Sequence, residues 1–233
     1  MSDTFRHSHI RSFVLRQGRL TPAQQKAIAE YWPEYGLDYQ PEPLELDKVF
    51  GRSAPKVLEI GAGMGENIVA MAHSHPENDY LVVEVHKPGI GKLIRQAVKL
   101  NLSNIRIINH DAVEVLSNQI QDNSLSQVLI FFPDPWPKKR HHKRRLIQAR
   151  FISELSRRML EHGRIFIATD WQDMAEHILA FCEQESSLIN LAGAGKFAPR
   201  PRWRPVTRFE ARGKNLKHGI WDLIYGINRS PAG

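Results

Sequence analysis

An acid held between two prolines stands directly before a run of basic residues in the middle of this chain. The segment reads Phe131-Phe132-Pro133-Asp134-Pro135-Trp136-Pro137, and the next eight residues, 138–145, are all Lys, Arg or His. Because Pro133 and Pro135 keep the backbone extended, no helix can absorb Asp134. Its carboxylate is therefore a candidate reacting group, and Trp136 offers a flat surface on which a nucleobase can stack.

The basic run carries six formal positive charges and two histidines, which is the chemistry of a grip for phosphates. Each part also has a plainer interpretation. The prolines are typical of a turn with Asp134 in a turn-forming role, Trp136 is equally consistent with core packing, and most charge runs are solvated surface. The adjacency of the two parts favours a reaction site joined to a segment that binds a polyanion.

A glycine-rich turn follows the first apolar strand pattern, in the order Glu59-Ile60-Gly61-Ala62-Gly63-Met64-Gly65-Glu66. Glycines at a strand-to-helix turn let the backbone pass close to a ligand. A dinucleotide fingerprint has glycine where Glu66 stands, and the carboxylates of Glu59 and Glu66 would repel a diphosphate. S-adenosylmethionine fits better, because it carries an ammonium and a sulfonium group and no phosphate. Glu66 alone is equally well explained as a first-turn acid that complements the helix dipole.

Three further acids stand where predicted strands end. Glu84 lies 19 positions after Gly65, the offset at which an acid accepts hydrogen bonds from ribose hydroxyls. Asp111 follows the third strand and could receive an adenine amino group. Asp170 ends the fifth strand beside Trp171. Each of these acids could instead be a surface residue or a helix cap. Their coincidence predicts a ligand site, since ligands of open α/β sheets bind at the carboxyl ends of the strands.

Short β-branched runs alternate with helical patterns from residue 56 onward. The predicted strands cover residues 56–60, 80–85, 105–109, 127–132, 164–169 and 220–227. The clearest predicted helices cover residues 91–102, 146–162 and 171–184. Several strand runs are continuously apolar, as expected where both faces of a sheet are covered. The alternation predicts an α/β fold with a Rossmann-like, doubly wound, mostly parallel sheet.

The first 50 residues differ in character from the rest. We expect residues 1–50 to form a basic N-terminal extension, partly helical or flexible, ahead of one ligand-binding domain over residues 51–233. Thr21-Pro22 predicts the capped start of a helix. Residues 193–219 predict a long basic loop, and 202–213 mixes basic and aromatic residues as nucleic-acid-binding loops do.

The composition narrows the class of partner. The 233 residues carry a formal net charge of +7, which favours polyanions, nucleic acid before membrane, although solubility alone also explains such a charge. Cys182 is the sole cysteine, so an internal disulfide and a multi-cysteine metal site are excluded, and we expect no metal. No apolar stretch reaches the ~18 residues of a membrane span and no signal peptide is visible. We therefore expect a cytoplasmic protein with no membrane partner.

The motifs together resemble the bacterial tRNA (guanine-N7-)-methyltransferases, a family of class I S-adenosylmethionine-dependent enzymes. The likeness covers about residues 35–228 and is carried by these segments: 58–65, Glu84-Val85-His86, His110-Asp111-Ala112, Phe132-Pro133-Asp134-Pro135-Trp136, Ala168-Thr169-Asp170-Trp171 and Thr207-Arg208-Phe209-Glu210. The Phe-Pro-Asp-Pro-Trp segment with its basic run and the segment from Thr207 are highly specific. The glycine turn indicates only a methyltransferase-like Rossmann fold.

The resemblance implies transfer of a methyl group from S-adenosylmethionine to N7 of a variable-loop guanine, position 46, in tRNA, with Asp134 as catalytic residue. It implies that the cofactor is bound by Glu59, Glu84, Asp111 and Asp134, around the turn of Gly61, Gly63 and Gly65. It implies a substrate side formed by Lys138, Asp170, Thr207, Arg208, Phe209 and Glu210. The RNA contact that it implies consists of Arg140, His141, His142, Lys143, Arg144 and Arg145.

Three alternatives stay open at this level. An exocyclic-amino methyltransferase resembles an Asp/Asn-Pro-Pro-aromatic loop at the same strand end, whereas this chain has the order Pro133-Asp134-Pro135-Trp136. A non-catalytic RNA-binding protein could keep the same fold. An NAD-dependent dehydrogenase comes last, because of Glu59 and Glu66. The oligomeric state, monomer or homodimer, is not predicted.

Overall fold

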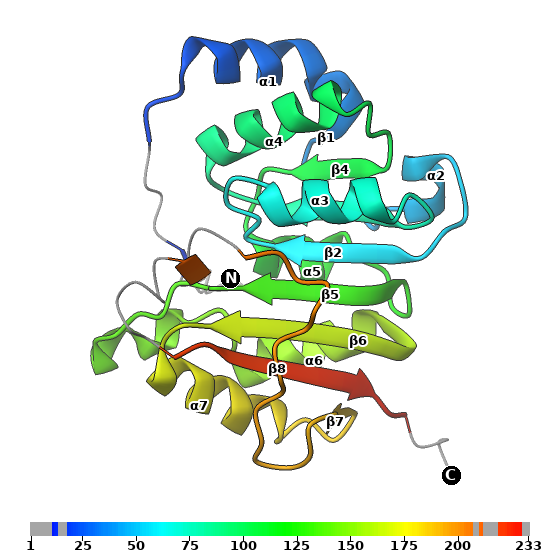
Figure 1. Cartoon of the computed structure of the whole chain (residues 1–233). Helices are drawn as coiled ribbons and strands as arrows, with labels where there is room; N and C mark the ends of the chain where they lie inside the picture. Colours follow the sequence, from blue (N-terminus) through cyan, green and yellow to red (C-terminus); the bar gives the residue numbers. More distant parts are fainter. Residues whose placement is uncertain (1–10, 14–17, 207–209, 212–218, 230–233) are drawn as a thin grey trace, which may run out of the picture.

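The computed structural model describes residues 11–13, 18–206, 210–211 and 219–229 (Figure 1). Within this part of the chain, eight strands form one sheet in the order β1-β4-β3-β2-β5-β6-β8-β7. The strands are β1 (Gly36–Leu37), β2 (Lys56–Ile60), β3 (Asp79–Val83), β4 (Ile105–Ile108), β5 (Leu125–Phe131), β6 (Met159–Thr169), β7 (Leu188–Asn190) and β8 (Trp221–Ile227). The predicted α/β fold is confirmed, and the six predicted strands correspond to β2, β3, β4, β5, β6 and β8.

The sheet is mostly parallel. Strands β1 to β6 pair only in parallel with one another, while β8 runs antiparallel to β6 and to β7. From β2 the chain first adds β3 and β4 on one side and then returns to add β5 and β6 on the other. The order therefore reverses between β2 and β5, which is where ligands of doubly wound sheets bind.

Helices cover both faces of the sheet. They are α1 (Pro22–Tyr35), α2 (Leu46–Phe50), α3 (Glu66–Ser74), α4 (Lys87–Lys99), α5 (Ala112–Asn118), the 3₁₀ helix η1 (Lys139–Arg144), α6 (Ala149–Arg158) and α7 (Gln172–Cys182). Helices α1, α3 and α4 share one apolar cluster with the sheet, and α2, α5, α6 and α7 share the other (Figure 1). None of the helices in the described ranges is long and apolar enough to cross a membrane.

The predicted start of α1 is confirmed. The hydroxyl of Thr21 accepts a hydrogen bond from the backbone N–H of Gln24, and the Gln24 side chain accepts one from the N–H of Thr21, so both orphan donors are satisfied. Gln24 also donates to the carbonyl of Pro88 at 2.9 Å, and its Cβ packs where Gly91 has no side chain. Helix α1 therefore lies directly on α4, and β1 adds to the edge of the sheet at β4.

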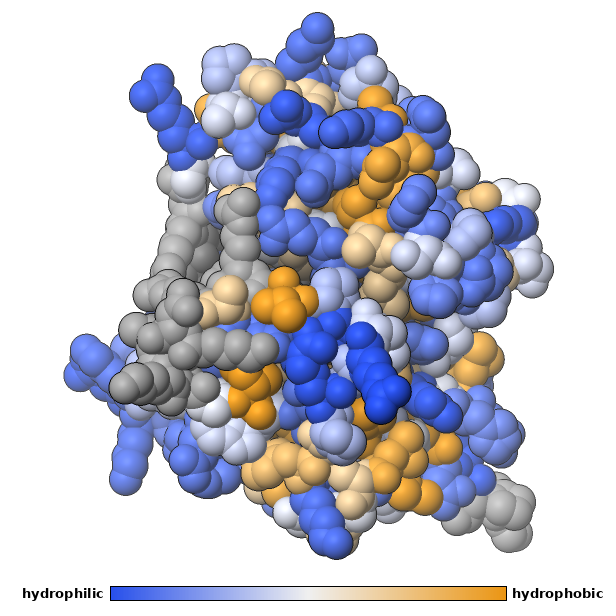
Figure 2. Space-filling model, in the orientation of Figure 1, coloured by the Kyte–Doolittle hydropathy of each residue, from blue (hydrophilic) through white to orange (hydrophobic). Residues whose placement is uncertain are grey.

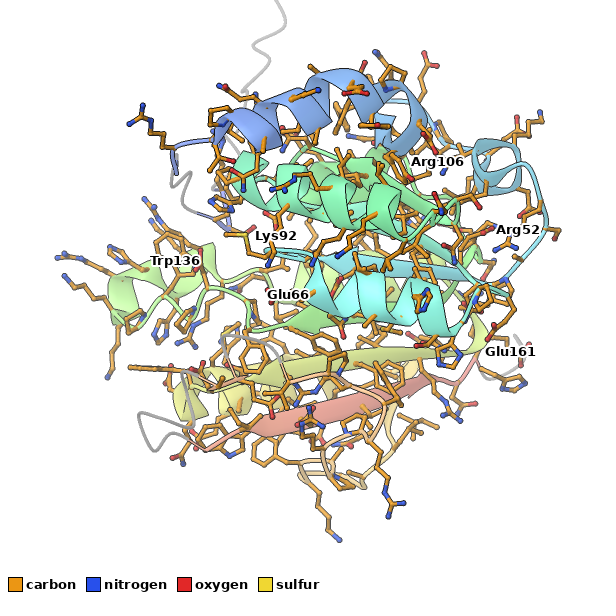
Figure 3. All side chains as sticks on the ribbon, turned by 45° about the horizontal axis from the view of Figure 1, so that its top comes forward. Arg52, Glu66, Lys92, Arg106, Trp136 and Glu161 are labelled. Carbon is orange, nitrogen blue, oxygen red and sulfur yellow. The ribbon has the colours of Figure 1, made fainter. Side chains whose placement is uncertain are left out.

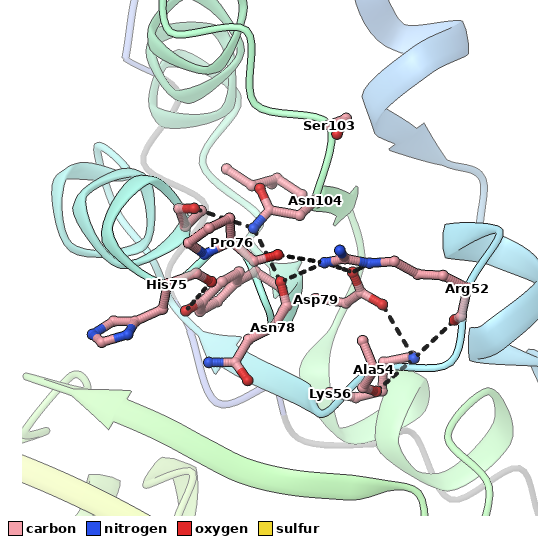
Figure 4. A network of polar contacts seen from close by, with 12 residues as sticks. Arg52, Ala54, Lys56, His75, Pro76, Asn78, Asp79, Ser103 and Asn104 are labelled. Atoms are coloured by element: carbon pink, nitrogen blue, oxygen red, sulfur yellow. Dashed lines mark hydrogen bonds and ion pairs between the residues drawn. The ribbon is translucent and has the colours of Figure 1, made fainter.

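A buried charge network holds the amino ends of β2 and β3 together (Figure 4). Asp79 is fully buried at the start of β3, where Arg52 and Lys56 reach its carboxylate at 2.7 Å and 3.1 Å. Buried charges require such partners. The network lies at the opposite end of the strands from the acids identified above, so it fixes the strand register without taking part in the predicted site.

The loop after β7 covers the part of the sheet that no helix covers on the α3 side. It passes in front of β5, β6 and β8 in Figure 1, and hydrophilic side chains gather over it in Figure 2. Ala198 bridges to Asp222 of β8, and the Trp203 ring meets the Phe166 ring edge to face at 5.0 Å. The predicted basic loop thus packs on the sheet through Ala198 and Trp203, and Arg204 of the same loop is buried beneath it.

Candidate active site

A cavity of about 400 Å³ opens at the carboxyl ends of β2, β3, β4 and β5. Its walls are mainly apolar and include two carboxylates, Glu84 and Asp134. The lining residues are Ser12, Phe13, Ile60, Gly61, Gly63, Val83, Glu84, Val85, His86, His110, Ala112, Phe131, Phe132, Pro133, Asp134 and Leu146. This size and character are those of a small-molecule site. The cavity lies at the carboxyl ends of the strands, as the sequence predicted, and at the reversal of strand order.

The glycine turn between β2 and α3 needs its glycines for two reasons. Gly61, Gly63 and Gly65 have φ values of 79°, 57° and 75°, which side-chain-bearing residues rarely adopt. A Cβ added at Gly65 would come within 2.6 Å of Leu93 on α4, whereas one added at Gly61 would meet nothing within 4 Å. Gly61 therefore leaves open space beside the cavity that it lines.

Glu84 links the glycine turn to the turn that follows β3. One carboxylate oxygen accepts from the N–H of Gly63 at 2.6 Å, and the other accepts from those of Val85 and His86 at 2.7 Å and 2.8 Å. Burial raises the pKa of Glu84, and the three amides partly oppose that rise. An ionised carboxylate has about four acceptor positions, so capacity for a ribose hydroxyl remains.

Glu59 lies in a different place from Glu84. Its side chain leaves β2 on the α3 face, is 3% exposed, and accepts from the Asn67 amide at 2.8 Å. Burial raises its pKa to about 7. Glu59 is not among the residues that line the cavity, although the charge of the neighbouring Glu84 adds to the rise in its pKa. Asp111 caps α5 by accepting from the N–H of Val113 at 2.9 Å, which is the plainer of its two predicted roles, and its neighbours His110 and Ala112 line the cavity.

Asp134 stands exposed at the rim of the cavity, as its flanking prolines predicted. The residues on either side of the two prolines are strained: Phe132 and Trp136 have φ values of 54° and 44°. The N–H of Phe132 donates to the carbonyl of Ala168 at 2.7 Å, which ties the end of β5 to β6. The carboxylate is therefore presented on a short, extended and strained loop beside the cavity.

The basic run folds into η1, which projects from the body of the protein next to Trp136 (Figure 3). Lys138, Lys139, Arg140, Lys143 and Arg144 are exposed, and His141 and His142 are half-buried. The Arg144 guanidinium lies over the Trp136 ring at 5.1 Å, and Trp136 donates to the carbonyl of Ser12. Trp136 is thus partly packed, between a cation and the N-terminal segment.

Arg145 lies apart from the exposed cations of the basic run. It was predicted to contact RNA with the rest of the run, but its side chain is buried. Its guanidinium donates to the carbonyl of Pro135 at 3.0 Å and pairs with Asp173 in the first turn of α7. This pairing lowers the pKa of Asp173. The charge of Arg145 is therefore satisfied inside the protein and faces no solvent.

Glu210, which was predicted on the substrate side, is fully buried in this structure. Its carboxylate pairs with Arg204 at 2.7 Å and with Arg200 at 2.9 Å. Asp170 is half-buried after β6, and Trp171 rather than Asp170 occupies the N-cap of α7. The remaining predicted substrate residues, Thr207, Arg208 and Phe209, lie outside the described residues.

Several residues of the site have no local sequence signal. Ser12 and Phe13 line the cavity, although they are more than 100 positions from Asp134. Asn67 donates a hydrogen bond to Glu59. The sequence indicates this role only through the position of Asn67 in the first turn of the helix that follows the glycine turn. Arg204 contacts the end of β5 from a loop that is close only in the folded protein.

The residues present fit S-adenosylmethionine. The cavity combines apolar walls, a glycine turn with open space at Gly61 and two carboxylates, and its lining residues include no Lys or Arg that would favour a diphosphate. A cationic nucleoside without phosphate satisfies this donor and acceptor set. Among the described residues, no group of three or more His, Cys, Asp or Glu side chains could hold a metal ion.

Comparison with known proteins agrees with this geometry. Residues 53–223 match a family model described as "Putative methyltransferase". The chain is 55% identical to the tRNA (guanine-N(7)-)-methyltransferase of Methylobacillus flagellatus, covering 93% of this chain and 90% of that protein. It is 48% identical to the enzyme of the same name from Hydrogenovibrio crunogenus, with the same coverage.

Solved structures of low sequence identity share the fold. The 16S rRNA methyltransferase KamB is similar with a TM-score of 0.58 at 12% identity, covering 79% of this chain and 93% of that one. A SAM-dependent methyltransferase from Aquifex aeolicus is similar with a TM-score of 0.52 at 13% identity, covering 90% and 100%. With the family match over most of the chain and relatives near 50% identity, this chain belongs to the tRNA (guanine-N7-)-methyltransferase family.

Proposed function

We propose that this protein transfers the methyl group of S-adenosylmethionine to N7 of a guanine in the tRNA variable loop, at position 46. The observation that carries the proposal is the placement of Asp134. Its carboxylate stands exposed at the rim of the cofactor-sized cavity, and the chain leads from it directly into the exposed cations of η1. A group that can orient a base thus lies between a methyl-donor site and a phosphate-binding segment.

The cofactor, when bound, supplies an electrophilic methyl group. Glu84 would accept from its ribose, the backbone of Gly61 and Gly63 would lie against it, and the segment from His110 to Ala112 would lie beside its adenine. Asp111 would act there chiefly by holding the start of α5. Glu59 would act from beneath the turn, because its side chain faces α3 rather than the cavity.

The reaction needs no general base, because guanine N7 carries no proton and presents a free lone pair. Catalysis can therefore consist mostly of positioning, for which effective molarities of about 10⁵–10⁸ M are known. Asp134 would accept hydrogen bonds from guanine N1–H and the exocyclic amino group. Its negative charge would also stabilise the positive charge that develops on the base as the methyl group is transferred.

The tRNA would be held by both sides of the site. On one side, Lys138 and the exposed cations of η1 would bind phosphates. On the other, Asp170 after β6 would contact the guanine, and Thr207, Arg208 and Phe209 are proposed as further substrate-binding residues. We place the activity in the cytoplasm, where tRNA is found.

The test is incubation of the protein with methyl-labelled S-adenosylmethionine and unmodified tRNA, followed by mapping of the labelled nucleoside. We expect N7-methylguanosine at position 46. Label on an exocyclic amino group would overturn the proposed target atom and favour the alternative methyltransferase. Tight tRNA binding without any label would favour a non-catalytic RNA-binding protein.

A further inference from the structure

The largest side chains that are fully buried in the described part of the chain are two arginines, Arg145 and Arg204, and both contact the surroundings of Asp134. Burying a guanidinium is costly unless it is paired and hydrogen-bonded. Neither arginine lines the cavity. Their position therefore calls for an explanation other than contact with cofactor or RNA.

The loop of residues 132–136, called the Asp134 loop below, depends on outside support for its shape. Phe132 and Trp136 hold positive φ values, and such conformations persist only where the surrounding structure imposes them. Pro133 and Pro135 have no N–H to donate, so the loop cannot form regular backbone hydrogen bonds of its own.

Arg145 supports the far end of the loop. Its Nε donates to the carbonyl oxygen of Pro135 at 3.0 Å, and a terminal nitrogen lies 3.0 Å from Nε2 of His142 while pairing with Asp173. One planar group thus joins the Asp134 loop, η1 and the first turn of α7. A lysine could reach one of these partners but could not fork between them.

Arg204 supports the near end of the loop. Its Cζ lies 5.5 Å and 5.7 Å from the ring centroids of Phe131 and Phe132, so the cation faces the aromatic pair that leads into Asp134. The same guanidinium pairs with Glu210 at 2.7 Å and with Asp222 of β8 at 3.1 Å. It joins the loop to the last long strand and to the segment that follows residue 209.

We propose that Arg145 and Arg204 are positioning residues, which hold the Asp134 loop from its two ends and so set the place of the Asp134 carboxylate. The inference rests on the methyl transfer proposed above. It assigns Arg145 a role inside the protein rather than on tRNA. It also explains why Glu210, in the segment predicted to face substrate, is buried: it is a counter-ion of Arg204.

The first test is Arg145→Met, with Arg145→Lys beside it. Asp173 is 57% exposed on its side chain, so water can solvate it when the guanidinium is removed and the variant should fold. We expect kcat to fall by about 10- to 100-fold, since misplacing a reacting group by about 1 Å has that effect. The KM for tRNA and the affinity for S-adenosylmethionine should stay unchanged, and lysine should restore little.

The second test is Arg204→Lys, which keeps a cation between Glu210 and Asp222 and so protects folding. It removes the flat group over Phe131 and Phe132, and kcat should again fall while KM holds. Arg158 supplies the matched control. It is also buried and paired, with Asp122 and Glu154, but it sits at the end of α6 beside the start of β6. Arg158→Lys should lower the melting temperature and leave kcat unchanged.

Tryptic cleavage within residues 138–144 gives a readout that needs no methyl transfer. Loss of the Arg145 anchor should speed this cleavage, with the Arg158 variant cleaved at the wild-type rate. A raised KM for tRNA at unchanged kcat would overturn the proposal and return Arg145 to the RNA surface. Unchanged cleavage and unchanged kcat would overturn it as well. If the wild-type protein transfers no methyl group but its Arg145 variant is still cleaved faster, the proposed function is contradicted while the support of the loop by Arg145 is not.

Discussion

At the scale of single residues, acids that look alike in the sequence occupy different environments. Asp134 is exposed on a strained loop, Glu84 is bound by three backbone amides, and Glu59 is buried against Asn67. Of these three carboxylates, only that of Asp134 is not held by hydrogen bonds from donors in the described part of the chain. This difference separates a group that can meet a substrate from groups that shape the cofactor site.

Replacing Asp134 with Asn should lower methyl transfer by at least ~100-fold, the scale of losing one preorganised electrostatic group. The amide keeps the shape, but it removes the negative charge and replaces one acceptor with a donor. Because the side chain is exposed, the melting temperature should not change. The control is Glu77→Gln, because Glu77 is an exposed carboxylate at the opposite end of the sheet. Near-normal turnover of the Asp134 variant would contradict its catalytic role.

Glu59 should make the stability of the protein depend on pH. Its pKa rises from a usual 4.5 to about 7 on folding, so the folded state binds the proton more tightly than the unfolded chain. The stabilisation is complete below about pH 4.5 and is lost as the pH rises through about 7, with a total on the order of 3 kcal/mol.

The measurement for Glu59 is the free energy of unfolding of the protein without cofactor, taken at intervals from pH 5 to pH 8. Glu59→Gln should show a smaller loss of stability over this range, because the amide does not titrate. Some loss should remain, since burial also raises the pKa of Glu84. Equal slopes for the two proteins would mean that Glu59 does not titrate there.

At the scale of elements, α4 acts as a support for the glycine turn. A Cβ at Gly89 would come within 1.8 Å of the carbonyl oxygen of Gly63, so the first turn of α4 touches the turn backbone to backbone. Glu84 binds the N–H of that same Gly63. The turn is therefore held from the helix on one side and from the end of β3 on the other.

Gly89→Ala should weaken S-adenosylmethionine binding by about 10-fold or more, because the displaced turn can no longer lie against the ligand and Glu84 together. Gly91→Ala, two positions along the same helix, is the matched control. Its added Cβ would meet Gln24 of α1 at 2.7 Å, and the three atoms nearest to it all belong to that residue rather than to the glycine turn. Isothermal titration of both variants should show weak binding only for the first, and equal losses would remove the special role of Gly89.

At the scale of the whole molecule, the positive charge is not spread evenly around the site. The chain carries a formal net charge of +7, and the exposed cations of η1 project from the sheet edge beside Asp134 (Figure 3). Each phosphate neutralised by such a cation releases counter-ions. The logarithm of the affinity therefore falls linearly with the logarithm of the salt concentration, and the slope is proportional to the number of phosphate contacts. The long-range attraction for tRNA should therefore be concentrated in this segment.

Replacing Lys139, Arg140, Lys143 and Arg144 with Ala should weaken tRNA binding and flatten its salt dependence, with the slope falling by roughly 3–4 for four lost phosphate contacts. S-adenosylmethionine affinity should not change. The control replaces four exposed cations on α1, α2 and α4, namely Lys26, Lys48, Arg95 and Lys99, for the same change in net charge. If both sets flatten the slope equally, η1 acts only through net charge.

The local pattern of the sequence determined much of this architecture. Apolar runs bounded by turns located β2, β3, β4, β5, β6 and β8, since strands buried on both faces have little choice of residue. Parallel strands end at one edge of the sheet, so the sequence alone places Glu84, Asp111 and Asp134 at that edge. The two prolines alone required that Asp134 stay outside a helix.

Tertiary structure alone decided which charges face inward. In the sequence, Arg145 is one of eight consecutive basic residues. Its burial is favourable only because the folded chain places the carbonyl of Pro135 and the carboxylate of Asp173 against its guanidinium. Glu210 is buried because Arg200 and Arg204 reach it. Ser12 lies at the site because the Trp136 indole N–H donates a hydrogen bond to its carbonyl, although the two residues are 124 positions apart. Burial of a charge depends on partners that are distant in the chain, and no local pattern of residues encodes that meeting.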